Sequence, residues 1–268
     1  MRELDRLSPL APAAPPTPSS TTEPTAPGRV AIVGNGRLGN ALAVALRAAG
    51  VTVSGPLRRG EAPAGVDAVL LCVPDAEIAA AAEAVPTELP VGHCSGATGL
   101  EPLADSRRDV FSLHPLMTVT GDPASTVFAG AGAAVAGSTP EMVSLARALA
   151  QRLDMRPIEV APGDRTAYHA AASIASNFLV TLEAAAERLA GTVGIEREDL
   201  LPLVRATVEN WARLGGERAL TGPVARGDEE TVAAQRQAIA EHAPDLLALF
   251  DTMVEATRAL ASGGALVR

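Results

Sequence analysis

The sequence predicts an α/β fold in which an N-terminal doubly wound parallel sheet is followed by an all-helical C-terminal domain. Three observations predict it. A glycine-rich turn over residues 34–39 separates a β-rich run from an Ala/Leu-rich helical run. Short apolar runs then alternate with helical segments as far as about residue 161. Beyond that point the periodicity is helical throughout, so the strands are confined to the N-terminal part.

The elements of the N-terminal domain, residues 28–162, follow in chain order. Residues 66–73 are apolar almost throughout, as expected of a strand buried on both faces. Pro74 and Asp75 then favour the first turn of a helix. The predicted strands are residues 29–33, 51–55, 66–73, 90–96, 109–115, 131–137 and 156–160. The predicted helices are residues 37–50, 74–85 and 139–153.

The C-terminal domain, residues 163–268, is predicted to contain one long helix and several shorter ones. They cover residues 164–192, 196–213, 229–240 and 244–261. Residues 1–27, at the other end, are rich in Pro, Ala, Ser and Thr and lack apolar periodicity. They are predicted to be a disordered tail.

Composition excludes several classes of protein. The formal net charge of −9 and the scarcity of aromatic residues disfavour binding of nucleic acid. Every basic residue is Arg, so lysine Schiff-base chemistry is excluded. Cys72 and Cys94 have neither a disulfide framework nor metal-ligand spacing, so no metal is predicted. No segment resembles a signal peptide or a membrane span, so we expect a soluble cytoplasmic protein.

The glycine-rich turn has the form of a dinucleotide-binding fingerprint. It reads Gly34-Asn35-Gly36-Arg37-Leu38-Gly39 and lies between a predicted strand and a predicted helix. In a Rossmann domain the first glycine allows the tight turn, the second admits the pyrophosphate, and the third lets helix and strand pack closely. Val73 and Pro74, after the third strand, are also expected to bind the cofactor. The alternative is a glycine-rich turn in an unrelated α/β domain.

The second strand indicates which dinucleotide is bound. An NAD enzyme usually has Asp or Glu at its end, to hold the ribose hydroxyls. This chain has Arg58 and Arg59 there and no acid before Glu61. Guanidinium groups suit a 2′-phosphate, so NADP (NADPH) is predicted and NAD is disfavoured. The alternative is a pair of solvated loop arginines.

Four further strings carry a resemblance to a known family. They are HCSG at 93–96, FSLHPL at 111–116, YHAA at 168–171 and TGPVARGD at 221–228. With the fingerprint, they resemble bacterial Rossmann-like proteins that carry a C-terminal domain of unknown function 2520. The resemblance implies a helical domain like that of the 6-phosphogluconate dehydrogenase superfamily and a homodimer through it. Some members look like an alternative type of ketopantoate reductase.

More distant relatives suggest residue roles. Prephenate dehydrogenases place a Ser after the fourth strand and a His-Pro after the fifth, and Ser95 and His114 look similar. Many β-hydroxyacid dehydrogenases and ketopantoate reductases use a Lys-x-x-x-Asn pair on the long helix. Here Ser173 stands in the Lys position, four residues before Asn177. The proton-donor role of that lysine must therefore be lost or moved.

Candidate catalytic residues lie at strand ends and on the long helix. Ser95 and His114 follow strands, where ligands of open α/β sheets bind, and an imidazole suits protonation of an alkoxide. His114 could alternatively cap a turn before Pro115. His169, Ser173 and Asn177 recur every four residues on one helix face, which could instead be an interhelical hydrogen-bond seam. Tyr168 is adjacent and could donate a hydrogen bond.

The loop at 221–228 offers a carboxylate clamp. Thr221 and Arg226 are expected to bind substrate, with Asp228 orienting the guanidinium. The alternative is a surface ion pair in a helix-linking turn. His93 is predicted to be a hydrogen-bonded core residue and His242 a surface residue.

Together these features predict an NADP-dependent reductase of a small carboxylate-bearing 2-oxo acid, with ketopantoate as the leading candidate. His114 or His169 would supply the proton, Ser95 and Asn177 would hold the reacting oxygen, and Arg226 would hold the carboxylate. The alternatives are a prephenate- or pyrroline-carboxylate-type enzyme, and a non-catalytic dinucleotide sensor or scaffold. The expected partners are a small-molecule substrate and a second copy of the chain.

Overall fold

A computed structural model describes residues 27–58, 60–103, 108–121, 124 and 126–263 of the chain. The predicted tail therefore lies almost entirely outside the described residues, as does Arg59. The chain divides into two compact units, Met1–His169 and Ala170–Arg268, which are described separately below. This division lies within a helix, a few residues beyond the boundary expected at residue 162.

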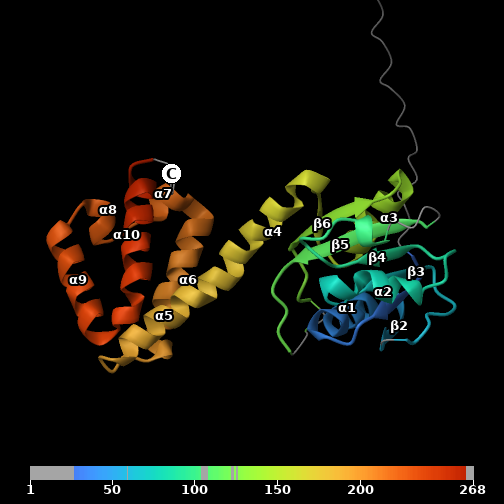
Figure 1. The fold of residues 1–268 in the computed structure, drawn as a ribbon, viewed down its shortest axis with the longest axis horizontal. Coiled ribbons are helices and arrows are strands. Elements are labelled where there is room, and N and C mark those ends of the chain that lie inside the picture. The colour runs from blue at the N-terminus through green and yellow to red at the C-terminus, as the bar shows by residue number, and fades with distance from the viewer. Residues whose placement is uncertain (1–26, 59, 104–107, 122–123, 125, 264–268) are drawn as a thin grey trace, which may run out of the picture. The chain divides into compact units, whose positions relative to one another are not determined.

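Unit 1 contains the predicted sheet (Figure 1). The described residues form seven strands in the order β2-β1-β3-β4-β5-β6-β7. The strands are β1 (Arg29–Val33), β2 (Thr52–Leu57), β3 (Ala68–Leu71), β4 (Val91–His93), β5 (Val110–Leu116), β6 (Gly132–Gly137) and β7 (Arg156–Glu159). The strand order reverses beside β1, so a crevice is expected outside the carboxyl ends of β1 and β3.

One strand pair corrects the expectation of a fully parallel sheet. β6 runs antiparallel to β5, with Phe111 opposite Gly137 and Leu116 opposite Gly132, while the other pairs are parallel. A parallel return needs a crossover, usually a helix. The described part of the connection from β5 to β6 contains turns and no helix. The chain therefore returns beside β5 in the opposite direction.

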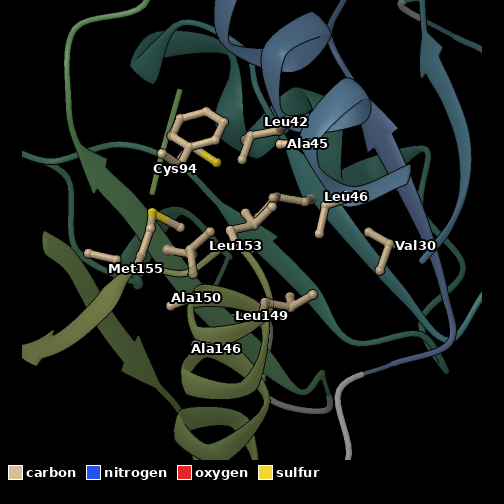
Figure 2. Packing of buried hydrophobic residues seen from close by; sticks show 14 of the residues in the cluster. Val30, Leu42, Ala45, Leu46, Cys94, Ala146, Leu149, Ala150, Leu153 and Met155 are labelled. Carbon is tan, nitrogen blue, oxygen red and sulfur yellow. The ribbon is translucent and has the colours of Figure 1, made fainter. Parts of the chain in front are cut away.

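Helices cover both faces of the sheet, as a doubly wound fold requires. Val30 and Ile32 of β1 point into a core with α1 (Arg37–Ala48) and α3 (Pro140–Arg152). Figure 2 shows part of this core, where Leu149 of α3 lies near Leu46 of α1. The alternate residues of β1, Ala31 and Val33, belong to a second core with α2 (Ile78–Glu83). The predicted helix 74–85 is divided, because a 3₁₀ turn, Asp75–Glu77, precedes α2.

Most helices of unit 2 match the predicted ranges. α6 (Arg197–Leu214), α9 (Glu229–His242) and α10 (Leu247–Ala261) lie close to them. Two short helices, α7 (Gly216–Ala219) and α8 (Pro223–Arg226), were not predicted. A helix of three or four residues carries too little periodicity to be recognised in a sequence.

The predicted long helix is interrupted in its middle. It starts in unit 1 as α4 (Arg165–Ser173), passes through a π-helical turn, Ile174–Phe178, and continues as α5 (Leu179–Gly191). A π turn closes i→i+5 hydrogen bonds, so the four-residue spacing that aligned Ser173 with Asn177 does not hold there. Within the described residues, no helix is both long and apolar enough to cross a membrane.

Candidate functional site

A pocket lies at the carboxyl ends of β1, β2 and β3 in unit 1. Its volume is about 1030 Å³, at the upper end of the usual range for ligand sites. Side chains and backbone from the glycine turn, the end of β2 and the β3–α2 connection line it. The lining residues at these three places include Gly34, Asn35, Gly36, Leu57, Arg58, Glu61, Val73, Pro74, Ala76 and Glu77.

The three fingerprint glycines stand in different surroundings. Gly34 has φ +112°, and a Cβ there would lie 2.3 Å from the carbonyl oxygen of Cys72. A Cβ on Gly39 would lie 1.9 Å from the carbonyl oxygen of Gly34. At Gly36, however, a Cβ would meet no atom within 4 Å. The fold itself requires the first and third glycines, whereas the second leaves open space beside the pocket.

The N-terminus of α1 is suited to an anion. Gly36 is the N-cap, no side chain caps the helix, and its first turn contains no acidic residue. The unpaired N–H groups and the positive end of the helix dipole are therefore available to a phosphate. The Asn40 amide donates to the carbonyl oxygens of Asn35 (2.7 Å) and Gly36 (3.0 Å), which holds the turn in place. A pyrophosphate fits this arrangement of open space and free donors.

A cationic and an anionic residue line the pocket just after β2. Arg58 is exposed and lines it. Glu61 also lines it, and its carboxylate accepts a hydrogen bond of 2.9 Å from the Arg58 backbone N–H. Glu61 was not predicted as a site residue, because a turn that brings residue 61 back beside residue 58 leaves no periodic signal in the sequence. Arg37 and Leu38 belong to the first turn of α1 and are not among the lining residues.

A second cluster of polar residues lies after β4. The Ser95 hydroxyl donates to Asp75 (2.7 Å) and accepts from the Thr98 backbone N–H (2.9 Å). The Thr98 hydroxyl donates to the same Asp75 oxygen (2.8 Å). His93 is fully buried: its Nδ1 accepts from the Ser95 N–H (3.1 Å), and its Nε2 bonds the Gly99 carbonyl (2.7 Å). Burial lowers the pKa of His93, so this ring is a neutral core residue, as predicted.

His114 near the end of β5 meets two residues of α4. Its Nδ1 lies 2.8 Å from the Tyr168 hydroxyl, and the two rings pack edge to face at 5.6 Å. The ring of His169 lies 6.1 Å away, also edge-on. A Cβ on Gly96 would lie 2.8 Å from Nε2 of His114 and 2.8 Å from Cδ2 of His169. The two imidazoles therefore pack against Gly96, where any larger residue would clash with both rings.

The surroundings of His114 and Tyr168 determine whether each side chain is charged. Burial, followed by the nearby His169 and Arg165, lowers the pKa of His114 from 6.5 to about 4. Burial raises the pKa of Tyr168. Both side chains are consequently uncharged near neutral pH, which changes what His114 can do as a proton donor.

Arg165, in the first turn of α4, is a buried cation that sequence analysis missed. It is 3% exposed, and it donates to the Ser112 hydroxyl (3.1 Å) and to the Ser95 carbonyl oxygen (2.8 Å). Its Nε has no partner, and among the described ion pairs none involves Arg165. Its spacing of three residues from Tyr168 was the available signal, because residues i and i+3 share a helix face.

The remaining candidate residues lie in unit 2. Asp228 caps α9, accepting from the backbone N–H (3.1 Å) and hydroxyl (2.7 Å) of Thr231. Arg226 is exposed in α8, and the described ion pairs do not join it to Asp228. Thr221 is exposed in the loop before α8. Asn177 lies in the π turn, where its backbone carbonyl accepts from the Thr181 hydroxyl (3.0 Å).

No metal centre is indicated. The described residues contain no group of three or more His, Cys, Asp or Glu side chains placed to bind a metal ion. Cys72 and Cys94 are free thiols whose sulfurs lie 3.8 Å apart.

The fold and the glycine turn define a Rossmann-type protein with a helical C-terminal region. Residues 132–257 match the family model described as "Domain of unknown function (DUF2520)". This match extends from β6 into α10 and confirms the resemblance carried by the sequence strings. A comparison with curated proteins finds no match.

Several solved structures share the fold. A candidate NADP oxidoreductase from Bacteroides fragilis has a TM-score of 0.75 and 19% identity, covering 86% of this chain and 98% of its own. Protein TM1727 from Thermotoga maritima has a TM-score of 0.72 and 23% identity, with 87% and 99% covered. A reductive aminase from Aspergillus terreus, in complex with NADPH and ethyl-5-oxohexanoate, has a TM-score of 0.62 and 18% identity, with 90% and 96% covered.

Proposed function

We propose that this protein is an NADP-dependent oxidoreductase that binds its dinucleotide in the pocket of unit 1. One observation carries the proposal: the space at Gly36 is open, at an uncapped helix N-terminus beside a pocket of about 1030 Å³. The name of the Bacteroides fragilis protein and the NADPH bound to the Aspergillus terreus enzyme support the same cofactor class.

The chain's own residues would hold the dinucleotide in two ways. Backbone N–H groups of the first turn of α1 would bind the pyrophosphate over Gly36. Asn35, Val73 and Pro74 would line the rest of the pocket. When bound, the reduced nicotinamide supplies a hydride, and the protein supplies orientation and a proton.

We favour NADP over NAD because Arg58 lines the pocket at the end of β2, with Arg59 next to it in sequence. A guanidinium there complements a 2′-phosphate. Glu61 acts in the opposite sense, since its carboxylate bonds the Arg58 backbone N–H and repels an incoming phosphate.

The proposed substrate is a small carboxylate-bearing 2-oxo acid, with ketopantoate (2-dehydropantoate) as the leading candidate. The family resemblance supports this reaction class. Arg226 of α8, with Thr221 in the loop before that helix, is the proposed carboxylate anchor. Ser173 and Asn177 are proposed to contact the substrate from the long helix. A prephenate- or pyrroline-carboxylate-type substrate is the alternative.

The catalytic assignments centre on the ends of β4 and β5. His114 is proposed to deliver the proton, with His169 adjacent to it. Ser95 would help to hold the reacting oxygen. Because its hydroxyl already donates to Asp75, it would do so only by exchanging that bond.

Two measurements test the proposed function. Calorimetry should find NADPH binding with one site per chain. A panel of ketopantoate, other small 2-oxo acids, pyrroline-5-carboxylate and prephenate should then contain a compound that drives steady oxidation or reduction of the cofactor. Absence of NADPH binding would contradict the proposal.

A non-catalytic sensor or scaffold is the second candidate function. The absence of any Lys in the sequence favours it, since many related dehydrogenases use a lysine as proton donor. NADPH binding without turnover of any compound in the panel would support this function instead.

We also propose a homodimer formed through the helical unit. Large apolar side chains of α6 and of the π turn with α5 are more than half exposed: Ile174 (61%), Phe178 (57%), Val180 (67%), Leu203 (66%) and Trp211 (61%). Five large exposed apolar side chains within residues 174–211 support a subunit interface in this part of the unit.

A further inference from the structure

We propose that Tyr168 is the proton source of the reaction, and that its proton reaches the substrate oxygen through the imidazole of His114. Arg165 is a positioning residue in this scheme, since its buried charge stabilises the phenolate that is left behind. The inference rests on the proposed oxidoreductase function and deepens it, because it replaces the missing lysine with residues of unit 1.

The first support is the hydrogen bond between the two side chains. The Tyr168 oxygen lies 2.8 Å from Nδ1 of His114. The backbone of Ala134, which pairs with His114 across β5 and β6, also hydrogen-bonds the phenol and lowers its pKa. The proposal takes Tyr168 as the donor in its bond with Nδ1, which places the ring proton of His114 on Nε2.

The second support is the direction in which Nε2 points. Within the described part of the chain, Nε2 of His114 has no hydrogen-bond partner, whereas Nδ1 has Tyr168. Nε2 lies beside Gly96, where a Cβ would be only 2.8 Å away and would clash with the ring. A donor without a protein partner near the carboxyl end of a strand, on the side where ligands of open α/β sheets bind, is suited to meet a substrate oxygen.

The third support is the unpaired cation. A buried charge without a carboxylate is costly, so its presence calls for a compensating role. Arg165 is 3% exposed and has only the Ser112 hydroxyl and the Ser95 carbonyl as partners. Its charge lowers the pKa of Tyr168, against the larger effect of burial. A phenolate at Tyr168 would supply the negative charge that Arg165 lacks.

The charged and titratable groups around His114 have opposing effects on its pKa. His169, Arg165 and His93 lower the pKa of His114, and Asp75 raises it. Asp75 is itself bonded to the hydroxyls of Ser95 and Thr98. With these groups in place, the imidazole stays neutral near pH 7 and can act only by passing a proton on.

The step balances for reduction of a carbonyl. When bound, NADPH would supply a hydride for the new C–H bond, and the carbonyl π electrons would move to oxygen. That oxygen takes the proton from Nε2 of His114 while Nδ1 takes the hydroxyl proton of Tyr168. The products are the alcohol, NADP⁺, a neutral imidazole with the other tautomer, and a phenolate beside Arg165. Nδ1 then returns its proton to the phenolate, and Nε2 takes one proton from solvent, which restores the phenol and the first tautomer.

This arrangement also favours one substrate class. An alkoxide formed by hydride transfer needs a proton, whereas a protonated imine yields a neutral amine without one. A buried guanidinium without a counter-ion also repels an iminium cation. The relay therefore favours a 2-oxo acid over a cyclic imine.

The sequence provides a direct probe, because Tyr168 is the one tyrosine in the chain. Ultraviolet titration of tyrosinate absorbance consequently reports this residue alone, without a substrate. Arg165→Gln should raise the pKa of Tyr168 by about one unit or more, the usual effect of a close charge. Arg165→Lys should keep it near the wild-type value. Circular dichroism would show that each variant is folded.

A matched control is available in the same unit. Arg108 is also partly buried, donates to backbone carbonyl oxygens (Ala82, 2.7 Å, and Val85, 2.9 Å) and has an unpartnered Nε. Arg108→Gln should leave the Tyr168 titration unchanged. If Arg165→Gln titrates like the wild type, or if Arg108→Gln shifts Tyr168 equally, the proposed charge stabilisation is overturned.

The relay itself is tested with Tyr168→Phe, which keeps the ring and removes the proton. With a carbonyl substrate from the panel, kcat should fall roughly a hundredfold, the scale of general acid catalysis, while the Kd for NADPH stays unchanged. The alkaline limb that Tyr168 gives to the pH profile should disappear. Normal turnover with an unaltered pH profile would overturn the relay. If the wild-type protein does not bind NADPH at all, the proposed function is refuted instead.

Discussion

At the scale of single residues, the burial of His114 changes the chemistry expected of it. A solvated imidazole titrates near neutral pH and could donate as a cation. Here burial and the neighbouring His169 and Arg165 lower its pKa to about 4. The neutral ring then lies between the Tyr168 hydroxyl, at Nδ1, and Gly96, at Nε2. Sequence analysis identified His114 and Tyr168, but it could not identify how burial changes their pKa values.

The same shift makes stability depend on pH. Since the pKa of His114 falls from 6.5 to about 4 on folding, the unfolded chain binds a proton in this range that the folded chain does not. The free energy of unfolding should therefore fall as pH decreases from 6.5 toward 4. His114→Gln should reduce that loss by at most about 3 kcal/mol, measured by urea denaturation at several pH values.

His242→Gln is the control for this prediction, because His242 is exposed at the end of α9. It should keep the wild-type pH dependence. Since burial also lowers the pKa of His93, some loss should remain in His114→Gln. An identical pH dependence in wild type and His114→Gln would contradict the assigned burial effect.

The burial of Arg165 could not be predicted from the sequence. An arginine is usually exposed, and the spacing from Tyr168 indicates only a shared helix face, not that Arg165 is 3% exposed. Its burial depends on Ser112 of β5 and on the Ser95 carbonyl, which lie 53 and 70 residues away in sequence. Only the fold brings these groups together.

At the scale of secondary-structure elements, local signals determined how well each could be predicted. The strand, glycine turn and helix of β1 and α1 were predicted closely, because the turn residues have specific local roles. The sequence predicted a parallel sheet and did not indicate that β6 is antiparallel to β5, because the residues of a strand do not specify the direction of its partner. The π turn at Ile174–Phe178 was also missed, because it leaves the apolar periodicity almost unchanged.

The turn after β2 gives a prediction about cofactor selection. Arg58→Ala should reduce the ratio of NADPH to NADH affinity, because it removes a guanidinium from the pocket lining. Glu61→Gln should increase NADPH affinity, because it removes a negative charge beside the Arg58 backbone N–H. Calorimetry with both cofactors measures each ratio.

Arg37→Ala is the control for cofactor selection, since Arg37 is not among the pocket-lining residues. It should leave the NADPH to NADH ratio unchanged. Equal affinities of the wild-type protein for both cofactors would contradict the assignment of the β2 end to the 2′-phosphate.

At the scale of the whole molecule, the two units differ in what they contain. Unit 1 contains the glycine turn, the pocket and the Tyr168–His114 pair, and its sheet and the helices packed on it contain nearly all of the buried hydrophobic residues. Unit 2 is formed by helices with few fully buried side chains, and it exposes large apolar residues. A second copy of the chain would explain that exposure.

Sedimentation should therefore give twice the chain mass of 27.2 kDa. Val180→Asp combined with Leu203→Asp places charges on the two most exposed of the five apolar residues above and should shift the protein toward monomer. Arg205→Asp changes the charge of an exposed residue of α6 and should leave the dimer intact. A monomeric wild-type protein at micromolar concentration would contradict the dimer.

The central claim is that the glycine turn of unit 1 binds NADPH, and Gly36→Val tests it most directly. A Cβ at Gly36 meets no atom of the protein within 4 Å, so the variant should fold and melt like the wild type. The branched side chain would occupy the space assigned to the pyrophosphate. Calorimetry should show NADPH affinity reduced by roughly a hundredfold, about 2.7 kcal/mol. Unchanged NADPH binding by a folded Gly36→Val variant would contradict the claim.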